Sequence, residues 1–275
     1  MIGLVGRQPE QQAVLLVLVS ALMWGLWWVP IRLGESMGLG GVWANLGVNF
    51  GGLLALGALA WLRPGQSSLS PRAWLGSILI GTAVSLYGAS LSLTDVARAV
   101  LLFYLAPAWS TAIEVMFLGR RWHWRRLPPL ILSFAGMLVV TRGEISLEGG
   151  GIGDLAALLS GLAWSAGSAL VFTTRDQSAA NLAFAVMIAA VIFSLTLLPL
   201  DWQTLPDLRS AEWARGATWM LLAGAIYLAP IILITLWGAE RLPPATISFL
   251  LTAEILSGIA TSAIFLDERF GWPEA

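Results

Sequence analysis

An acidic side chain inside an apolar segment is the feature of this sequence best suited to chemistry. Glu254 lies near the centre of residues 246–266, an apolar run long enough to cross a membrane. Ionisable groups at that depth are costly and usually mark the path of a substrate or an ion. We expect Glu254 to bind a substrate ammonium group or to exchange a proton. The alternative is a protonated acid hydrogen-bonded to Ser248, Thr252 or Ser257 within a helix interface.

Tryptophans in the middle of apolar segments could form a second part of a binding site. Trp24 and Trp28 are four residues apart and would share one face of a continuous helix. Trp164 occupies the position of Trp24 in a later, similar segment. Such an aromatic wall suits flat amphipathic ligands, through stacking and cation–π contact. Packing alone is the alternative for Trp24 and Trp164, and it is the favoured interpretation for Trp27.

Amides and phenols complete the set of candidate contacts. Asn45 and Asn49 give one helix a polar face that could bind a ligand carboxylate, although hydrogen bonds between helices are favoured. The three tyrosines each lie in or near an apolar segment, and each offers one hydroxyl donor. The predicted substrate-binding residues are Trp24, Trp28, Asn45, Tyr87, Tyr104, Trp164, Tyr227 and Glu254. The sequence shows no metal-ligand cluster, nucleotide loop or nucleophile–base pair, so no catalytic residue, cofactor or metal is predicted.

The elements that must position these residues are membrane-spanning helices. Of the 275 residues, 57% are hydrophobic and 11% are charged, whereas a soluble domain has about a quarter charged residues. There is no Cys, so disulfides and thiolate metal sites are excluded. The predicted spans are residues 12–33, 39–61, 74–93, 96–118, 127–141, 153–174, 178–199, 217–238 and 244–266. Prolines at positions 30, 107 and 230 are expected to kink the first, fourth and eighth spans.

The charges between the spans predict the orientation. All 15 basic residues are Arg, and alternate loops place nine of them on one side, opposite most of the acids. The Arg-rich side should face the cytoplasm, which puts the N-terminus inside. The predicted location is the inner (plasma) membrane.

An internal repeat divides the chain. Residues 20–25 (SALMWG) resemble residues 160–165 (SGLAWS), and residues 117–121 (FLGRR) resemble residues 265–269 (FLDER), at offsets of 140 and 148. Ordered matches at a nearly constant offset predict a duplication. Five spans per half would insert the second half in the opposite sense, which is common in transporters but also compatible with a receptor or scaffold. The expected units are residues 1–142 and residues 143–275, the second lacking its last helix.

Several short motifs carry a resemblance to a known family. They are residues 21–25 (ALMWG), 102–107 (LFYLAP), 117–119 (FLG), 163–164 (AW), 250–254 (LLTAE) and 265–268 (FLDE). In this ordered set the chain resembles the drug/metabolite transporter superfamily, in its EamA-type ten-helix branch. It is most similar there to the YddG-type exporters of aromatic and other amino acids. Arg120 and Ile255 stand where the family often has Glu and Pro, so a coupling mechanism is not carried over.

Taken together, the sequence predicts an all-α polytopic membrane protein that transports small amphipathic metabolites by alternating access. The resemblance implies amino acids as substrates, including aromatic ones, and export as the direction. The predicted partners are a small-molecule substrate and the lipid bilayer, with protons if transport is proton-coupled rather than facilitated diffusion. No nucleic acid is expected, and the oligomeric state is left open. The alternatives are a nucleotide-sugar or sugar-phosphate exchanger, a membrane receptor, and an intramembrane enzyme.

Overall fold

The computed structural model describes residues 8–62, 68–116, 124, 131, 151–174, 177–200, 209–242 and 244–265. Every regular element among them is a helix, which confirms the predicted all-α class. The elements are α1 (Gln8–Gly25), α2 (Trp28–Ser36), α3 (Gly41–Leu62), α4 (Pro71–Leu93), α5 (Val96–Phe103), α6 (Ala106–Met116), α8 (Ile152–Val171), α9 (Ala179–Leu197), α10 (Ala211–Ala223), the π-helical turn η4 (Gly224–Leu228), α11 (Ala229–Ala239), α12 (Pro244–Leu251) and α13 (Ala253–Phe265).

Seven helical stretches within these residues are long and apolar enough to cross a membrane. They are Glu10–Ser36, Gly41–Leu62, Pro71–Leu93, Val96–Ile113, Ile152–Val171, Ala179–Leu200 and Ala211–Ala239. They coincide with seven of the predicted spans, and the last predicted span appears as α12 and α13, with a shorter apolar stretch over Phe249–Phe265. The fifth predicted span, residues 127–141, lies outside the described residues.

Prolines account for three of the interruptions in these stretches. Proline has no N–H for the carbonyl four residues earlier, so a helix tends to end just before it. Pro30 and Pro107 lie in the first turns of α2 and α6, after breaks in the first and fourth spans, and Pro230 follows the turn η4. The helix is therefore broken before the first two prolines, and a π-helical turn precedes the third.

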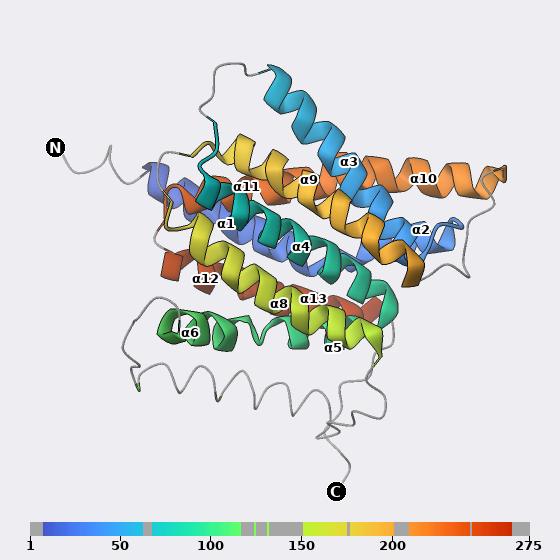
Figure 1. Ribbon diagram of the computed structural model, residues 1–275. Helices are drawn as coiled ribbons and strands as arrows, with labels where there is room; N and C mark the ends of the chain where they lie inside the picture. The colour runs from blue at the N-terminus through green and yellow to red at the C-terminus, as the bar shows by residue number, and fades with distance from the viewer. Residues whose placement is uncertain are drawn as a thin grey trace, which may run out of the picture.

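The helices lie side by side, and the two halves of the chain interlock. Helix α4 packs on α8 and α9, while the α10–η4–α11 stretch packs on α1, α2 and α3. Similarly, α5 and α6 pack on α8, while α12 and α13 pack on α1. Figure 1 shows that α1 runs from left to right and α8 from right to left, as the colour bar indicates. The packing is thus reciprocal, with the third and fourth spans of each half lying against the first spans of the other.

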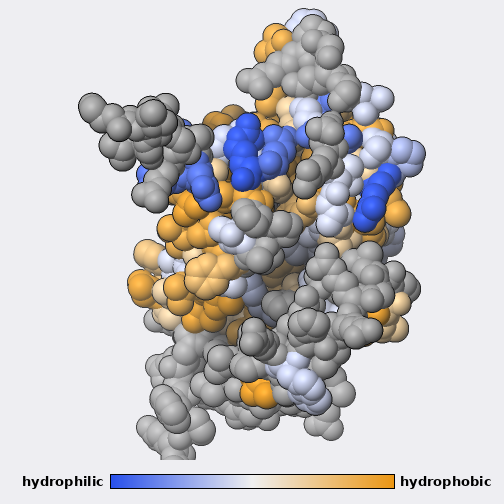
Figure 2. Space-filling model, turned by 90° about the vertical axis from the view of Figure 1, so that its left-hand side faces the viewer, coloured by the Kyte–Doolittle hydropathy of each residue, from blue (hydrophilic) through white to orange (hydrophobic). Residues whose placement is uncertain are grey.

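Glycines allow the closest of these contacts. A Cβ atom on Gly51 of α3 would lie 2.1 Å from the Leu221 carbonyl oxygen, and one on Gly224 would lie 2.0 Å from that of Val48. Backbones that approach this closely are a common feature of helix pairs in membranes. Large apolar side chains such as Leu15, Ile226 and Leu256 are exposed on the outside. Figure 2 views the molecule from the left-hand side of Figure 1. Hydrophilic side chains gather on the upper part of this side, next to hydrophobic ones.

Candidate functional site

Three broken spans supply the main elements of the candidate site. The breaks lie between α1 and α2, between α5 and α6, and between α12 and α13. Helices α5 and α12 have eight residues each, and α12 begins and ends 148 residues after α5. The fourth and ninth spans are therefore broken at equivalent places in the repeat. Each break exposes backbone carbonyls, which must find partners inside the protein because lipid offers none.

Side chains from distant helices satisfy the carbonyls at the first break. The amide of Leu26 bonds the Met23 carbonyl instead of continuing the α-helical pattern. Ser257 on α13 donates its hydroxyl to the Leu22 carbonyl at 3.0 Å, and Tyr227 in η4 donates its hydroxyl to the Met23 carbonyl. The first break is thus held by the eighth and ninth spans, which belong to the other half of the chain.

Glu254 lies at the ninth-span break, in the first turn of α13. It is 4% exposed, so it faces the protein interior and not the hydrocarbon. The hydroxyl oxygen of Tyr104, at the break between α5 and α6, lies 2.9 Å from Glu254 Oε2 and 2.6 Å from the Leu251 carbonyl oxygen. One phenol therefore joins the two equivalent breaks. The other carboxyl oxygen, Oε1, has no hydrogen-bond partner among the described residues.

Two of the three hydroxyl groups that the sequence offers as partners for Glu254 bond elsewhere. Thr252 donates to the Phe249 carbonyl at 2.6 Å, and Ser257 donates to backbone carbonyls of α1 and α13. The side chain of Ser248 lies outside the described part of the structure. The groups that the structure brings to the carboxyl group instead are the phenols of Tyr104 and Tyr87.

All three predicted tyrosines lie within electrostatic range of this carboxyl group. Tyr87 on α4, Tyr104 and Tyr227 each interact electrostatically with Glu254, although they come from the third, fourth and eighth spans. No basic side chain within the described residues pairs with Glu254. The immediate surroundings are neutral phenols, backbone groups and aromatic rings.

Five aromatic side chains beside this cluster form a closed circuit of ring contacts. The centroid distances are 5.0 Å for Trp24–Trp27, 5.7 Å for Trp27–Tyr87, 4.8 Å for Tyr87–Phe103, 6.3 Å for Phe103–Trp164 and 6.2 Å for Trp164–Trp24. We call these five residues the aromatic ring. Tyr104 attaches to it through Phe103, at 5.4 Å. Such pairs lie within the range of favourable ring–ring geometry.

The aromatic ring contains two residues that are not among the predicted substrate-binding residues, Trp27 and Phe103. Packing is the favoured interpretation of Trp27 from the sequence, and Phe103 is not among the candidate residues. The first-span break explains the difference, because Trp24 and Trp28 no longer share the face of one helix. The Trp24 indole donates to Thr235 on α11, whereas the Trp28 indole donates to Thr261 on α13, both at 3.2 Å. The phenylalanine had a signal, since it directly precedes Tyr104 at a break marked by proline.

Asn45 lies in a different cluster, which binds helices together. Its amide donates to the Ser85 carbonyl on α4 at 2.8 Å. Asn49 donates to Asn45 Oδ1 at 3.2 Å and to Ser194 Oγ on α9 at 2.9 Å, and the Ser85 and Ser194 hydroxyls are 2.8 Å apart. We call these four residues the amide cluster. Hydrogen bonding between helices, which was the favoured interpretation of the two asparagines, describes these contacts.

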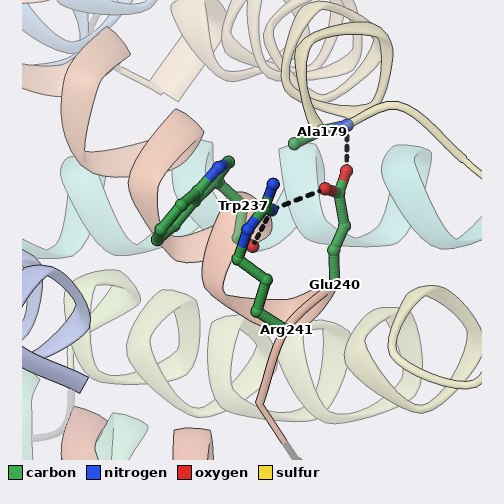
Figure 3. Close-up of polar contacts among 4 residues, drawn as sticks. All are labelled: Ala179, Trp237, Glu240 and Arg241. Carbon is green, nitrogen blue, oxygen red and sulfur yellow. Dashed lines mark hydrogen bonds and ion pairs between the residues drawn. The ribbon is translucent and has the colours of Figure 1, made fainter. Parts of the chain in front are cut away.

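The resolved ion pairs lie away from Glu254. Arg98 pairs with Asp154 at 2.7 Å, joining α5 to the first turn of α8. Figure 3 shows a second group, in which Arg241 pairs with Glu240 at 2.8 Å and lies over the Trp237 ring at 4.0 Å. The other oxygen of Glu240 accepts the Ala179 amide at the start of α9. The described residues contain no group of three His, Cys, Asp or Glu side chains that could hold a metal ion.

Comparisons with known proteins place the chain in a family. The model of the EamA-like transporter family matches residues 11–142 and again residues 151–275. No curated protein sequence matches the chain. One solved structure, described only as the crystal structure of a protein, is 20% identical over 94% of this chain and 99% of its own, with a TM-score of 0.49. Similarity to the YddG-type exporters stays a prediction. Because the family model covers nearly the whole chain in two copies, the protein belongs to the EamA-like transporter family and is a multi-pass membrane protein.

Proposed function

We propose that this protein is a secondary transporter that exports small amphipathic metabolites, amino acids including aromatic ones, by alternating access. The observation that carries the proposal is the position of Glu254, at a helix break facing an equivalent break and beside the aromatic ring. In membrane transporters, substrate sites commonly lie where discontinuous helices meet at the interface of two repeats.

The residues at the breaks suit an amino acid with an apolar side chain. A substrate ammonium group pairs with Glu254 Oε1, which has no partner among the described residues. Its side chain lies against the aromatic ring, whose members also favour a nearby cation. The Tyr87 hydroxyl interacts with the same carboxyl group and offers the ligand a further polar contact. The Tyr227 hydroxyl donates to the Met23 carbonyl and acts on the carboxyl group through its charge distribution alone.

The proposed cycle uses the two halves of the chain as inverted units, residues 1–142 and residues 143–275. The reciprocal packing and the opposite directions of α1 and α8 support this arrangement. In the cycle, the short helices α5, α6, α12 and α13 pivot at their breaks and open the site to one side at a time. The sorting of Arg supports an inner-membrane protein with a cytoplasmic N-terminus, and the family resemblance supports export.

A carrier of phosphate-containing substrates is less well supported. Such a carrier needs cationic side chains beside its substrate site. Arg32, Arg98 and Arg241 each pair with an acidic residue, at 3.1 Å, 2.7 Å and 2.8 Å. The central group at the helix breaks is instead an acid.

Flux into proteoliposomes tests the proposed function. L-Phenylalanine and L-tryptophan should enter vesicles that contain the protein, while glucose 6-phosphate should not. Glu254→Gln should reduce the flux of both amino acids to about a tenth or less, since a charge-assisted hydrogen bond contributes about 1.5–3 kcal/mol. Glu212→Gln, the same change at an exposed site, is the matched control and should behave as wild type. Equal flux in all three proteins would return Glu254 to a structural role, and flux of the phosphate ester alone would overturn the substrate class.

A further inference from the structure

The two contacts of the Tyr104 hydroxyl group require more protons than the phenol itself supplies. Its oxygen lies 2.6 Å from the Leu251 carbonyl oxygen and 2.9 Å from Glu254 Oε2. Both distances are typical of O–H···O hydrogen bonds. A phenol carries one proton, and a backbone carbonyl carries none. Both contacts can be full hydrogen bonds only if Glu254 supplies a second proton, so that the carboxyl group donates to Tyr104 while Tyr104 donates to Leu251.

The surroundings of Glu254 agree with a neutral acid. The elements packed on α13 are α1, α5 and α12. The acid of α1, Glu10, is exposed, Arg98 of α5 pairs with Asp154, and α12 has no ionisable side chain. The titratable groups that face the carboxyl are the phenols of α4, of the fourth-span break and of η4. A buried carboxylate that has no cation beside it among the described residues would be strongly unfavourable.

From this geometry we propose that Glu254 holds a proton in the substrate-free protein, that a substrate ammonium group displaces it, and that Tyr104 transmits the exchange to the ninth-span break. This inference rests on the proposed function and identifies the proton as the ion whose movement is coupled to transport. On binding, the carboxylic O–H bond breaks, the proton leaves to water and the ammonium group pairs with the carboxylate. The proton of Tyr104 then turns from the Leu251 carbonyl to Glu254 Oε2. The last carbonyl of α12 is released, and the break becomes free to move.

The protonated state can be tested without any substrate. Infrared difference spectra of the purified full-length protein in lipid, between wild type and Glu254→Gln, should contain the carbonyl band of a protonated carboxylic acid at neutral pH. The control difference between wild type and Glu212→Gln should lack it. A carboxylate band in the Glu254 difference would overturn the assignment, whether or not the protein transports amino acids.

The exchange predicts one proton released for each L-phenylalanine bound, measured with a pH indicator in weakly buffered solution. Because proton and ligand compete for one group, the apparent Kd should rise about tenfold for each unit by which the pH is lowered. Glu254→Gln should release no proton, and its residual binding should not depend on pH. Binding by wild type without proton release would overturn the exchange but leave the proposed transport function standing.

Accumulation tests the role of Tyr104 as a positioning residue. With the vesicle interior one pH unit more acidic and the membrane potential clamped at zero, one-for-one exchange should concentrate L-phenylalanine about tenfold. Tyr104→Phe should lower this ratio towards one, whatever its effect on the rate of uptake without a gradient. If Tyr104 were merely structural, the substitution would slow uptake and leave the ratio unchanged. Wild-type uptake that does not respond to the pH gradient would reject proton coupling but leave the proposed function standing. No uptake under any condition would reject the proposed function itself.

Discussion

Two buried polar clusters in this protein differ in how they are built. The amide cluster of Asn45, Asn49, Ser85 and Ser194 joins α3, α4 and α9, which are continuous helices. The cluster of Glu254 with Tyr104 joins two helix breaks at equivalent positions of the repeat. Hydrogen bonds between continuous helices fix one packing, whereas bonds that close broken backbone can be exchanged when the helices move. The comparison suggests a static scaffold beside a mobile site.

The largest expected effect separates activity from stability at the mobile site. Glu254→Met replaces the acid by an apolar side chain of similar length, so it should abolish transport. The melting temperature in detergent should stay the same or rise, because Tyr104 keeps its hydrogen bond to the Leu251 carbonyl and the change leaves no buried donor unpaired. A marked fall in melting temperature with normal flux in the remaining folded protein would mean that the acid belongs to the scaffold.

The opposite pattern is expected at the amide cluster. Asn45→Leu leaves the Ser85 carbonyl, the Asn49 amide and the Ser194 hydroxyl with fewer partners, so stability should fall by about 1–2 kcal/mol. Thermal unfolding in detergent measures the loss. The KM for L-phenylalanine of the folded fraction should not change, and a large change in KM would place Asn45 at the substrate.

A smaller effect should distinguish two tryptophans of the first span. Trp24→Phe keeps a smaller ring at two contacts of the aromatic ring, each worth about 0.5–1.5 kcal/mol, so a partial loss of about 1 kcal/mol in total should raise KM for L-phenylalanine roughly fivefold. Trp28→Phe loses one hydrogen bond to Thr261 and should change KM less than twofold. Flux measured over a range of concentrations compares the two, and the reverse order would contradict the boundary drawn around the aromatic ring.

The smallest effect is expected at the ion pair between α5 and α8. Asp154→Asn weakens a contact with a half-exposed Arg98 and should cost about 1 kcal/mol or less. The melting temperature should drop slightly, and the flux at saturating L-phenylalanine should stay close to that of wild type. A tenfold change in flux would give this helix end a gating role.

The sequence indicated the spans because the bilayer demands long apolar helices, and eight of the nine predicted spans fall on described helices. It also indicated Glu254 and the tyrosines, since polar groups are rare at that depth. The assignment of Trp24 and Trp28 to one face was wrong, because that periodicity holds only within a continuous helix. The break before Pro30 changes the phase and brings Trp27 to Trp24 instead.

The break in the ninth span had no comparable signal. Its first half ends at Leu251, and residues 252–256 contain no proline. The helical pattern is interrupted at Thr252, whose hydroxyl and amide both bond the Phe249 carbonyl. The contact between Tyr104 and Glu254 spans 150 residues and depends on how two breaks pack, which residue spacing within one segment cannot report.

The most direct test of the central claim is protection of Glu254 from chemical modification. A hydrophobic carbodiimide reacts with protonated carboxyl groups in apolar surroundings, and peptide mass spectrometry locates the product. We predict modification at Glu254 in wild-type vesicles and dose-dependent protection by L-phenylalanine, with Glu212→Gln unchanged. If Glu254 were still modified at saturating amounts of a transported substrate, the claim that substrate reaches this carboxyl group would be contradicted.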